Sequence, residues 1–274
     1  MKINLVVIIL LSLINLLVAR DNFKIIKNLK YGISEKNSLD MYIPKNNLNK
    51  KVIFMVHGGA WRFGDKSSKT VVKNKVKYWV SRGYVFVSTN YSLSSNIDVY
   101  EQAREVARAL TYSQNYLREY GIKSKDFVLM GHSAGAHLVS LLTSNTGIAY
   151  EEGAKLWSST ISIDNAAFNI SKIMNNKHQR LYDKAFGKDK LFWRKVSPFY
   201  QLKGKIVPFL AICSTKRKIS CEDSEEYIKK AKSFGSSASI LKIDYNHKRT
   251  NKKLGLNNSY TKQVDRFILE NLNK

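Results

Sequence analysis

The sequence places one serine between two glycines, at the junction of an apolar run and a segment with helical spacing. Gly131-His132-Ser133-Ala134-Gly135 follows the apolar residues 127–130, and small and apolar residues continue behind it. A serine on such a sharp strand-to-helix turn is presented at the end of a sheet, where it can act as a nucleophile. The motif is short, so it predicts a nucleophile only if the chain also supplies the partners that a nucleophilic serine requires.

A second glycine-rich segment follows another apolar run. Residues 52–56 are continuously apolar, which is typical of a buried parallel strand, and His57-Gly58-Gly59-Ala60-Trp61 comes directly after them. Small residues at such a turn let backbone N–H groups approach a substrate oxygen. We expect the aromatic residues beside this turn, Trp61 and Phe63, to line a substrate pocket.

Together the two motifs resemble those of the α/β-hydrolase superfamily, in its esterase/lipase group with an HGGxW oxyanion motif and a GxSxG nucleophile elbow. The chain is similar to hormone-sensitive-lipase-like and feruloyl-esterase-like carboxylesterases and to kynurenine formamidases, over most of residues 50–270. The resemblance implies that Ser133 is the nucleophile and that His57 organises its turn. It also implies that the oxyanion is bound by the backbone N–H groups of Gly59, Ala60 and Ala134.

A nucleophilic serine also needs a general base. His247 lies three residues beyond Asp244, behind the last predicted strand, where the resemblance places the catalytic histidine. The other histidines are less suitable, because they lie inside the elbow, on the helix behind it and in a later irregular segment (His132, His137 and His178). We therefore predict His247 as the base.

The acid that orients this base is where the sequence departs from the family pattern. Relatives carry an aspartate shortly after the penultimate strand, but residues 213–221 are basic, apolar and small there. Asp164, at the end of the preceding strand, is our first candidate, and Asp223, next to Glu222, is the second. Each has a structural alternative: Asp164 can form a turn, and Asp223 can cap a helix with Glu226 three residues later.

Apolar runs alternate with amphipathic segments along most of the chain. This predicts an α/β fold, with a mostly parallel central sheet and helices on both faces, in one domain over residues 20–274. Residues 165–205 are aromatic-rich and irregular, and we expect them to form a small cap insertion. Strands are predicted at 23–29, 39–43, 52–56, 84–88, 127–130, 157–163, 206–213 and 239–243, and helices at 71–81, 99–120, 223–234 and 260–272.

The charge of the chain is strongly positive. The sequence has 46 lysines and arginines against 21 aspartates and glutamates, a formal net charge of +25 over 274 residues. Such a charge favours a polyanionic partner. However, the lysines are scattered through every segment and form no arginine-rich run, so we expect no specific nucleic-acid partner.

The first nineteen residues are typical of an export signal. One lysine precedes an apolar run that is short for a bilayer-spanning helix, so we predict a signal peptide, with an uncleaved N-terminal anchor as the alternative. The protein is then periplasmic or secreted, with no stable membrane span if the signal is cleaved. In an exported chain, Cys213 and Cys221 can form a disulfide.

These residues predict a serine hydrolase that cleaves small to medium carboxylic esters through an acyl-enzyme on Ser133. One alternative is an amidase of the arylformamidase type. Another is a degenerate, non-catalytic binding protein, suggested by the missing family aspartate and the charge of +25. We expect no cofactor, and the sequence shows no metal-binding spacing; the oligomeric state stays open.

Overall fold

The computed structural model describes residues 22–93 and 97–272. The predicted signal peptide or anchor, residues 1–19, lies outside the described residues. Within them, no helix is both long enough and apolar enough to cross a membrane.

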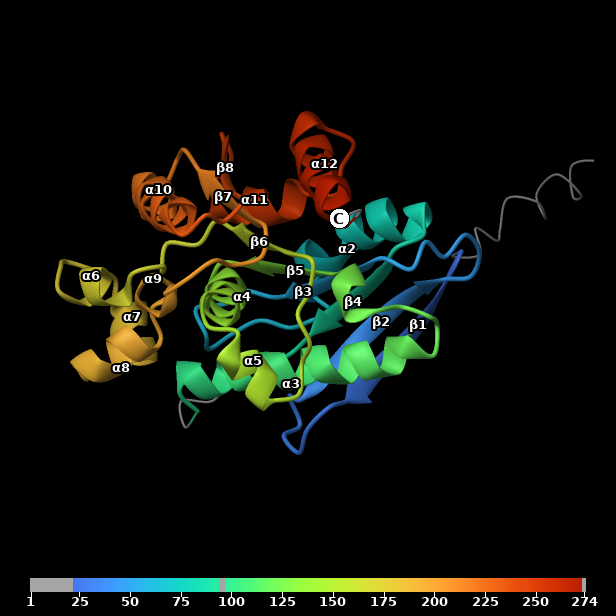
Figure 1. Cartoon of the computed structure of the whole chain (residues 1–274), viewed down its shortest axis with the longest axis horizontal. Coiled ribbons are helices and arrows are strands. Elements are labelled where there is room, and N and C mark those ends of the chain that lie inside the picture. The colour runs from blue at the N-terminus through green and yellow to red at the C-terminus, as the bar shows by residue number, and fades with distance from the viewer. Residues whose placement is uncertain (1–21, 94–96, 273–274) are drawn as a thin grey trace, which may run out of the picture.

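Eight strands form one sheet in the order β1-β2-β4-β3-β5-β6-β7-β8 (Figure 1). The strands β1 and β2 form an antiparallel edge, and β2 is also antiparallel to β4, whereas every pairing from β4 to β8 is parallel. The predicted mostly parallel sheet is therefore confirmed. The strands are β1 (Phe23–Lys30), β2 (Ser38–Pro44), β3 (Val52–Val56), β4 (Val85–Thr89), β5 (Phe127–His132), β6 (Ser159–Ile163), β7 (Phe209–Ser214) and β8 (Ala238–Ile243).

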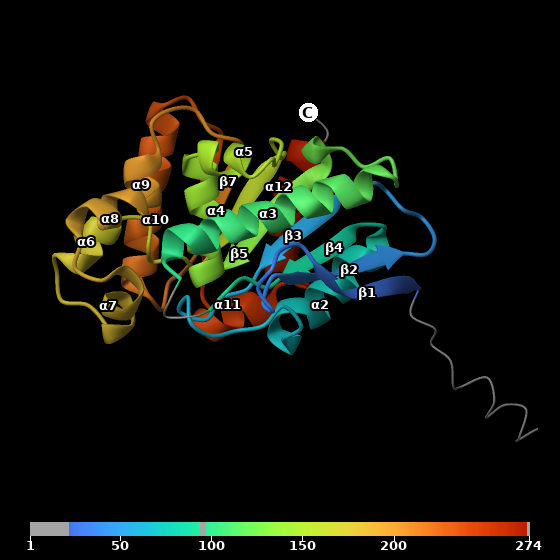
Figure 2. The same cartoon turned by 90° about the horizontal axis from the view of Figure 1, so that it is seen from below.

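Helices cover both faces of this sheet, as the alternating pattern predicts (Figure 2). One face packs against α3 (Val99–Arg118), α4 (Ala134–Ser144) and α5 (Gly147–Glu151), and the other against α2 (Lys69–Trp79) and α12 (Ser259–Leu272). Two short 3-10 helices, η1 (Val80–Arg82) and η2 (Ser124–Asp126), precede β4 and β5.

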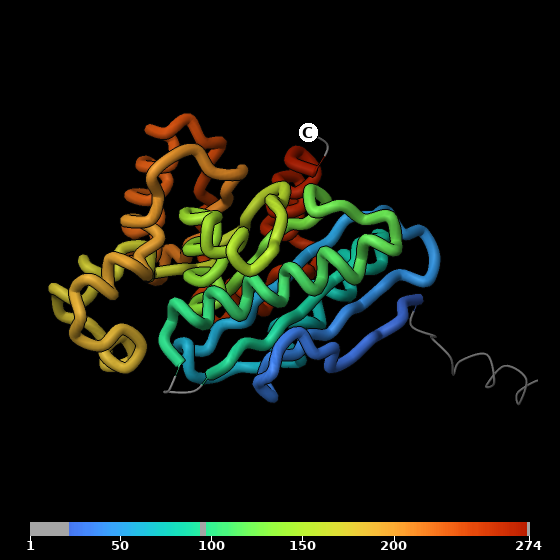
Figure 3. The backbone as a smooth tube through the Cα atoms, turned by 60° about the horizontal axis from the view of Figure 1, so that its bottom comes forward, coloured from blue at the N-terminus to red at the C-terminus, as the bar shows by residue number. Residues whose placement is uncertain are grey.

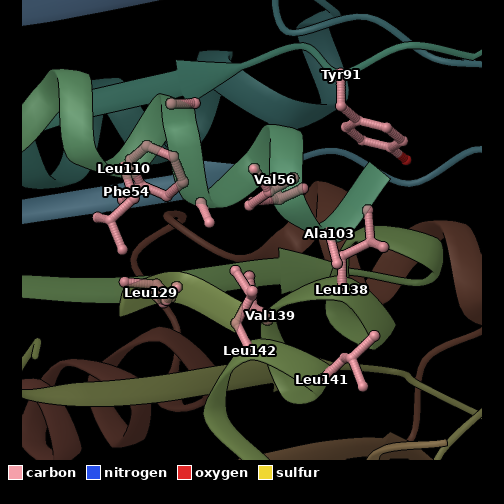
Figure 4. Close-up of a cluster of buried hydrophobic side chains, with 14 of the residues drawn as sticks. Phe54, Val56, Tyr91, Ala103, Leu110, Leu129, Leu138, Val139, Leu141 and Leu142 are labelled. Atoms are coloured by element: carbon pink, nitrogen blue, oxygen red, sulfur yellow. The ribbon is translucent and has the colours of Figure 1, made fainter. Parts of the chain in front are cut away.

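The core forms because the central strands are apolar on both faces. Every residue of β3, β4 and β5 is buried. Figure 4 shows Phe54, Val56 and Leu129 of the sheet facing Leu110 of α3 and Leu138 of α4. The nucleophile elbow connects β5 to α4, so it is attached to the best-packed part of the molecule.

The cap insertion is helical rather than irregular, which corrects the prediction. Residues 165–205 contain α6 (Ile170–Met174), α7 (Arg180–Phe186), α8 (Lys190–Lys195) and α9 (Pro198–Gln201). These helices gather at one end of the molecule, seen as the yellow-to-orange tube in Figure 3. Each has four to seven residues, too few for a clear periodic pattern to be read from the sequence.

Three further helices differ from the prediction. The helix α10 (Lys218–Ser233) begins five residues earlier than expected, and neither α5 (Gly147–Glu151) nor α11 (His247–Lys253) was predicted. The start of α10 lacks a capping side chain, and Arg217 occupies the cap position, so its sequence carries no start signal. The helix α11 is short and strongly basic, which resembles a loop in sequence.

Candidate active site

Ser133 occupies a strained turn between β5 and α4. Its φ and ψ are 55° and −120°, a conformation that a non-glycine residue adopts only where the surrounding structure enforces it. The flanking glycines are required by close packing. A Cβ on Gly135 would lie 2.3 Å from the Val56 carbonyl oxygen, and one on Gly131 would lie 2.3 Å from the Gly135 carbonyl oxygen. Gly135 therefore allows the elbow to sit against β3, and Gly131 allows the elbow to close tightly on itself.

Sheet register brings Asp164 beside the elbow. The last residue pair between β5 and β6 is His132 with Ile163, so the residues that follow, Ser133 and Asp164, leave the sheet at the same level. The Ser133 N–H donates to the Ile163 carbonyl oxygen at 2.9 Å. Asp164 also has a positive φ, 51°, and its side chain is fully buried. Both side chains thus lie at the carboxyl ends of adjacent parallel strands.

His247 links these two side chains. It is the first residue of α11, and Asn246 caps this helix by accepting from the Arg249 N–H at 3.0 Å. The Nε2 atom of His247 lies 2.9 Å from Ser133 Oγ, and its Nδ1 atom lies 2.6 Å from Asp164 Oδ2. His132 also holds His247 in place, because its Nε2 donates to the His247 carbonyl oxygen at 3.0 Å.

The hydrogen-bond partners assign the histidine tautomer. A carboxylate only accepts, so His247 Nδ1 carries the proton and donates it to Asp164, which leaves Nε2 free to accept from the Ser133 hydroxyl. Arg217 Nη1 lies 2.7 Å from the same Nδ1 atom. Because a guanidinium only donates, this contact is a close approach of two donors that share Asp164 Oδ2.

Asp164 is held in its charged form. Burial by itself would raise the pKa of this carboxyl, but the hydrogen bond from His247, the charge of Arg217 and the hydrogen bond from Ser220 outweigh it and hold the pKa well below its usual value. Ser220 Oγ–H donates to Oδ1 at 2.6 Å, and the Ser214 N–H donates to the same oxygen at 3.1 Å. An acceptor for the imidazole is therefore present at neutral pH.

Asp223, the second candidate acid, points elsewhere. Its Oδ2 accepts from the Phe168 N–H at 2.7 Å, and burial raises its pKa to about 6. It lies in the second turn of α10, so the helix-capping alternative is wrong as well. Its neighbour Glu222 pairs with Lys218 at 3.6 Å. The structure thus brings Asp164, and neither of these two carboxylates, to His247.

The glycine-rich turn after β3 lies beside the elbow. The N–H groups of Arg62 and Phe63 both donate to the Gly59 carbonyl oxygen, at 3.0 and 2.8 Å, and close the turn. Gly59 and Ala60 have positive φ values of 140° and 51°. In residues 22–93 and 97–272 we find no acceptor for the backbone N–H groups of Gly59, Ala60 and Ala134.

His57 supports this turn, and no hydrogen bond among the described residues joins its ring to Ser133. Its Nδ1 donates to the Gly58 carbonyl oxygen at 2.9 Å, and its ring stacks on Tyr91 with ring centroids 4.7 Å apart. Burial lowers its pKa, so the ring is neutral. His137 is also buried, with a pKa lowered to about 4, and it accepts from Trp61 Nε1 at 3.2 Å.

A cavity of about 700 Å³ opens above Ser133; we call it the catalytic cavity. Trp61 and Phe63 both line it, as expected. Trp61 is buried and packs against Tyr182 and Phe186 of the cap, whereas the Phe63 side chain is 69% exposed at the rim. Of the cap aromatics, Tyr182 lines the cavity, whereas Phe186 and Trp193 are buried in the main hydrophobic core and Phe168 packs against Phe209 and Tyr227.

The loop between β7 and α10 carries functional candidates that the sequence analysis missed. Cys213 and Cys221, the pair that the sequence analysis considered for a disulfide, are bonded across this loop. The missed residues are Arg217 and Ser220, which lie between them and reach Asp164. In the family pattern this loop supplies the acid, so the sequence analysis interpreted the basic residues there only as the loss of that acid. The contacts of Arg217 and Ser220 with Asp164 depend on the fold and leave no signal in the sequence.

Residues 39–230 match the BD-FAE family model, which is more than half of the chain. The chain belongs to the BD-FAE family. Two relatives of the chain are an isoprenylcysteine alpha-carbonyl methylesterase of Arabidopsis thaliana and a kynurenine formamidase of Danio rerio. The first is 24% identical over 78% of the chain and 54% of the relative; the second is 28% identical over 50% of the chain and 45% of the relative. The chain thus spans about half, or less, of the curated relatives it matches.

Solved structures confirm the α/β-hydrolase fold of this BD-FAE chain. A truncated carbohydrate esterase from gut microbiota has a TM-score of 0.76 at 17% identity, with 93% of this chain and 99% of that chain covered. Esterase B from Lactobacillus Rhamnosis has a TM-score of 0.73 at 18% identity, covering 98% and 92%. At these identities the likeness establishes the fold.

Proposed function

We propose that the protein is a serine carboxylesterase that cleaves small to medium carboxylic esters. The observation that carries this proposal is the unbroken contact series from Ser133 Oγ to His247 Nε2, 2.9 Å, and from His247 Nδ1 to Asp164 Oδ2, 2.6 Å. A serine next to a histidine that a carboxylate orients is the arrangement of an activated nucleophile.

In the proposed reaction, His247 Nε2 takes the proton of Ser133 Oγ as this oxygen attacks the ester carbonyl carbon. The negative charge that develops on the carbonyl oxygen is stabilised by the N–H groups of Gly59, Ala60 and Ala134. Asp164 stabilises the imidazolium. His247 then returns its proton to the leaving alcohol, and the acyl group stays on Ser133 until water, activated by the same histidine, releases it as a carboxylic acid.

A fluorophosphonate probe tests the nucleophile. We expect it to label the wild-type protein on one residue and to leave Ser133→Ala unlabelled, while Ser140→Ala, a buried serine on α4 outside the catalytic cavity, stays labelled. A wild-type protein that neither reacts with the probe nor hydrolyses p-nitrophenyl acetate would contradict the proposal.

An arylformamidase activity is the second candidate. Kynurenine formamidases of Danio rerio and Salmo salar are 28% and 30% identical to about half of this chain. The same Ser133 chemistry would cleave an N-formyl group. Comparing kcat/KM for N-formylkynurenine and p-nitrophenyl acetate separates the two candidates, and we expect the acetate ester to be the better substrate.

We further propose that the protein is exported. The support is the lysine-led apolar stretch at the start of the sequence and the Cys213–Cys221 disulfide, a bond typical of oxidising compartments. Expression of the full chain and of a variant without residues 2–19, followed by fractionation, tests this proposal. Equal cytoplasmic retention of both would contradict it.

A further inference from the structure

Arg217 lies where two cavities meet. It lines the catalytic cavity and a second cavity of about 750 Å³ between α10 and the cap helices α6 and α7, which we call the cap cavity. Gln179 and Tyr182 also line both. A substrate bound at Ser133 and extending toward the cap would therefore pass the guanidinium of Arg217.

Only part of this guanidinium is used by the protein. Nη1 donates to Asp164 Oδ2 at 2.9 Å and approaches the Asp164 carbonyl oxygen at 3.3 Å. Nε and Nη2 have no acceptor among residues 22–93 and 97–272, and the side chain is 29% exposed. These two nitrogens form an edge of the guanidinium that matches the two oxygens of a carboxylate.

The carboxylates near this edge are already engaged. In the catalytic cavity, Asp65 accepts from Ser67 and Asn90, and Asp164 accepts from His247 and Ser220. In the cap cavity, Asp223 accepts from a backbone N–H and Glu222 pairs with Lys218. Lys177 in the cap cavity and Lys248 in the catalytic cavity form no ion pair with any described residue.

We propose that Arg217 binds a carboxylate carried by the substrate, so that the protein prefers anionic esters, such as half-esters of dicarboxylic acids or acyl esters of hydroxy acids. The inference rests on the proposed esterase function and names its substrate class. Arg217 Nη1 lies 2.7 Å from His247 Nδ1, and His247 Nε2 lies 2.9 Å from Ser133 Oγ, so a carboxylate on the guanidinium would lie farther from the scissile ester than the width of one imidazole ring.

Arg217 also gives such a substrate a catalytic advantage. The guanidinium lies next to the His247 imidazole, which must become positively charged in the transition state. The positive charge of Arg217 opposes this change. A substrate carboxylate on the free edge of the guanidinium offsets this opposition, because its negative charge compensates the positive charge of Arg217. Anionic esters should therefore have a higher kcat as well as a lower KM than their neutral counterparts.

The test compares esters that differ only in charge. For the acyl side, the pair is mono-p-nitrophenyl adipate and its terminal carboxamide; for the alcohol side, it is 4-acetoxybenzoate and 4-acetoxybenzamide. The measured quantity is the ratio of kcat/KM for the carboxylate to kcat/KM for the carboxamide, at low ionic strength. In the wild-type protein we expect a ratio above ten in one of the two pairs, and that pair identifies the side that carries the carboxylate.

Three variants give this ratio its meaning. Arg217→Gln should lower the ratio at least tenfold, and Arg217→Lys should give an intermediate value, because a lysine keeps the charge without the paired donors. The matched control is Lys216→Gln, which removes the same charge from the preceding residue. The side chains of Lys216 and of its partner Asp244 are exposed, and neither residue lines either cavity, so this variant should leave the ratio unchanged.

Each other outcome overturns the proposal. A wild-type ratio near one in both pairs would exclude carboxylate recognition. Equal losses on carboxylate and carboxamide esters in both Arg217 variants would mean that Arg217 acts only on Asp164 and His247. An equal effect of Lys216→Gln would assign the preference to the general positive field. If the carboxylate preference is absent but Ser133 is still labelled by a fluorophosphonate and the carboxamide esters are cleaved, the esterase function stands without this specificity. Absence of labelling and of all hydrolysis would overturn both.

Discussion

At the scale of single residues, two buried aspartates illustrate how environment separates similar side chains. Asp164 accepts from His247, Arg217 and Ser220, which together outweigh the effect of burial and keep it charged. Asp223 is buried with mainly backbone partners, so burial dominates and raises its pKa to about 6. This difference makes Asp164 the carboxylate suited to orient a catalytic histidine, and it makes the two aspartates separable by mutation.

Asp164→Asn should remove most of the activity. The amide can no longer accept the Nδ1 proton as a carboxylate does, so the imidazole loses both its preferred tautomer and the charge that stabilises the imidazolium. We expect kcat for p-nitrophenyl acetate to fall by a factor of about 10³ to 10⁴. The matched control is Asp223→Asn, for which we expect less than a fivefold change, about 1 kcal/mol in the barrier. A fall in Asp223→Asn as large as that in Asp164→Asn would contradict the assignment.

Asp223 should instead affect stability, with a defined pH dependence. Its pKa is raised from 3.8 to about 6 in the folded protein, so the folded state binds the proton more tightly and becomes less stable as pH rises from about 4 through 6. Asp223→Asn lacks this loss. Relative to wild type, its free energy of unfolding should gain on the order of 2 kcal/mol between pH 4 and pH 7, measured by urea denaturation. A difference that does not vary with pH would refute the role of the buried carboxyl.

At the scale of elements, the site depends on connections that hold loops against the sheet. The β7–α10 loop is closed by Cys213–Cys221 and brings Ser220 to Asp164. The helix α11, which presents His247, is tied to α2 through Lys75, a fully buried lysine whose Nζ donates to the Asn251 carbonyl oxygen and side chain at 2.9 and 2.6 Å. Neither connection touches Ser133, but one holds the residues that contact Asp164 and the other holds the helix that carries His247.

Removing the disulfide should loosen the β7–α10 loop. The double variant Cys213→Ser/Cys221→Ser frees a loop with a sequence separation of 8, for which the chain-entropy relation gives a loss of about 2 to 3 kcal/mol in the free energy of unfolding. Because Ser220, next to Cys221 in the first turn of α10, supports Asp164, kcat should fall as well. Urea denaturation and p-nitrophenyl acetate hydrolysis measure the two effects. Treatment of the wild type with dithiothreitol should reproduce them, and unchanged values in both would contradict the role of the loop.

Lys75 should give stability a pH dependence of the opposite sign to that of Asp223. Burial lowers its pKa from 10.5 to about 7, so above pH 7 the unfolded state binds more protons than the folded state, and stability from this group rises between about pH 7 and 10. Lys75→Met lacks this rise. The control is Lys73→Met, an exposed lysine of the same helix, which should keep it. Parallel curves for wild type and Lys75→Met from pH 7 to 9.5 would contradict the prediction.

At the scale of the whole molecule, the charge of +25 acts independently of the active site. Lysines scattered over the surface attract polyanions without selecting among them, and this attraction weakens as salt releases the condensed counterions. A charge of this kind also raises the local concentration of anionic substrates around the cavities that Arg217 joins.

Wild type and Ser133→Ala should therefore bind heparin equally. We expect retention on a heparin column at 50 mM NaCl and elution well below 1 M, with the same elution point for both proteins, because the charge distribution does not depend on the elbow. Ester hydrolysis by the wild type should persist at the eluting salt concentration. Heparin binding that resists 1 M NaCl, together with absence of hydrolysis, would favour the degenerate binding protein instead.

The sequence by itself was sufficient for the local features. The apolar runs at 52–56 and 127–130 followed by glycine-rich turns predicted the strands, the elbow at Ser133 and the turn at Gly59, because burial on both faces and tight turns leave a direct imprint on residue type. We also ranked Asp164 first as the partner of His247 from the sequence, because it lies at a strand end. The sequence did not exclude Asp223.

Only the tertiary structure decided which carboxylate meets His247. The register of β5 and β6 sets Asp164 beside Ser133, and α10, which starts at Lys218, turns Asp223 toward Phe168. The same holds for Arg217, whose contact with Asp164 joins residues 53 positions apart. Residue types and local spacing do not decide such pairings, because the pairings arise from strand register and helix packing over the whole chain.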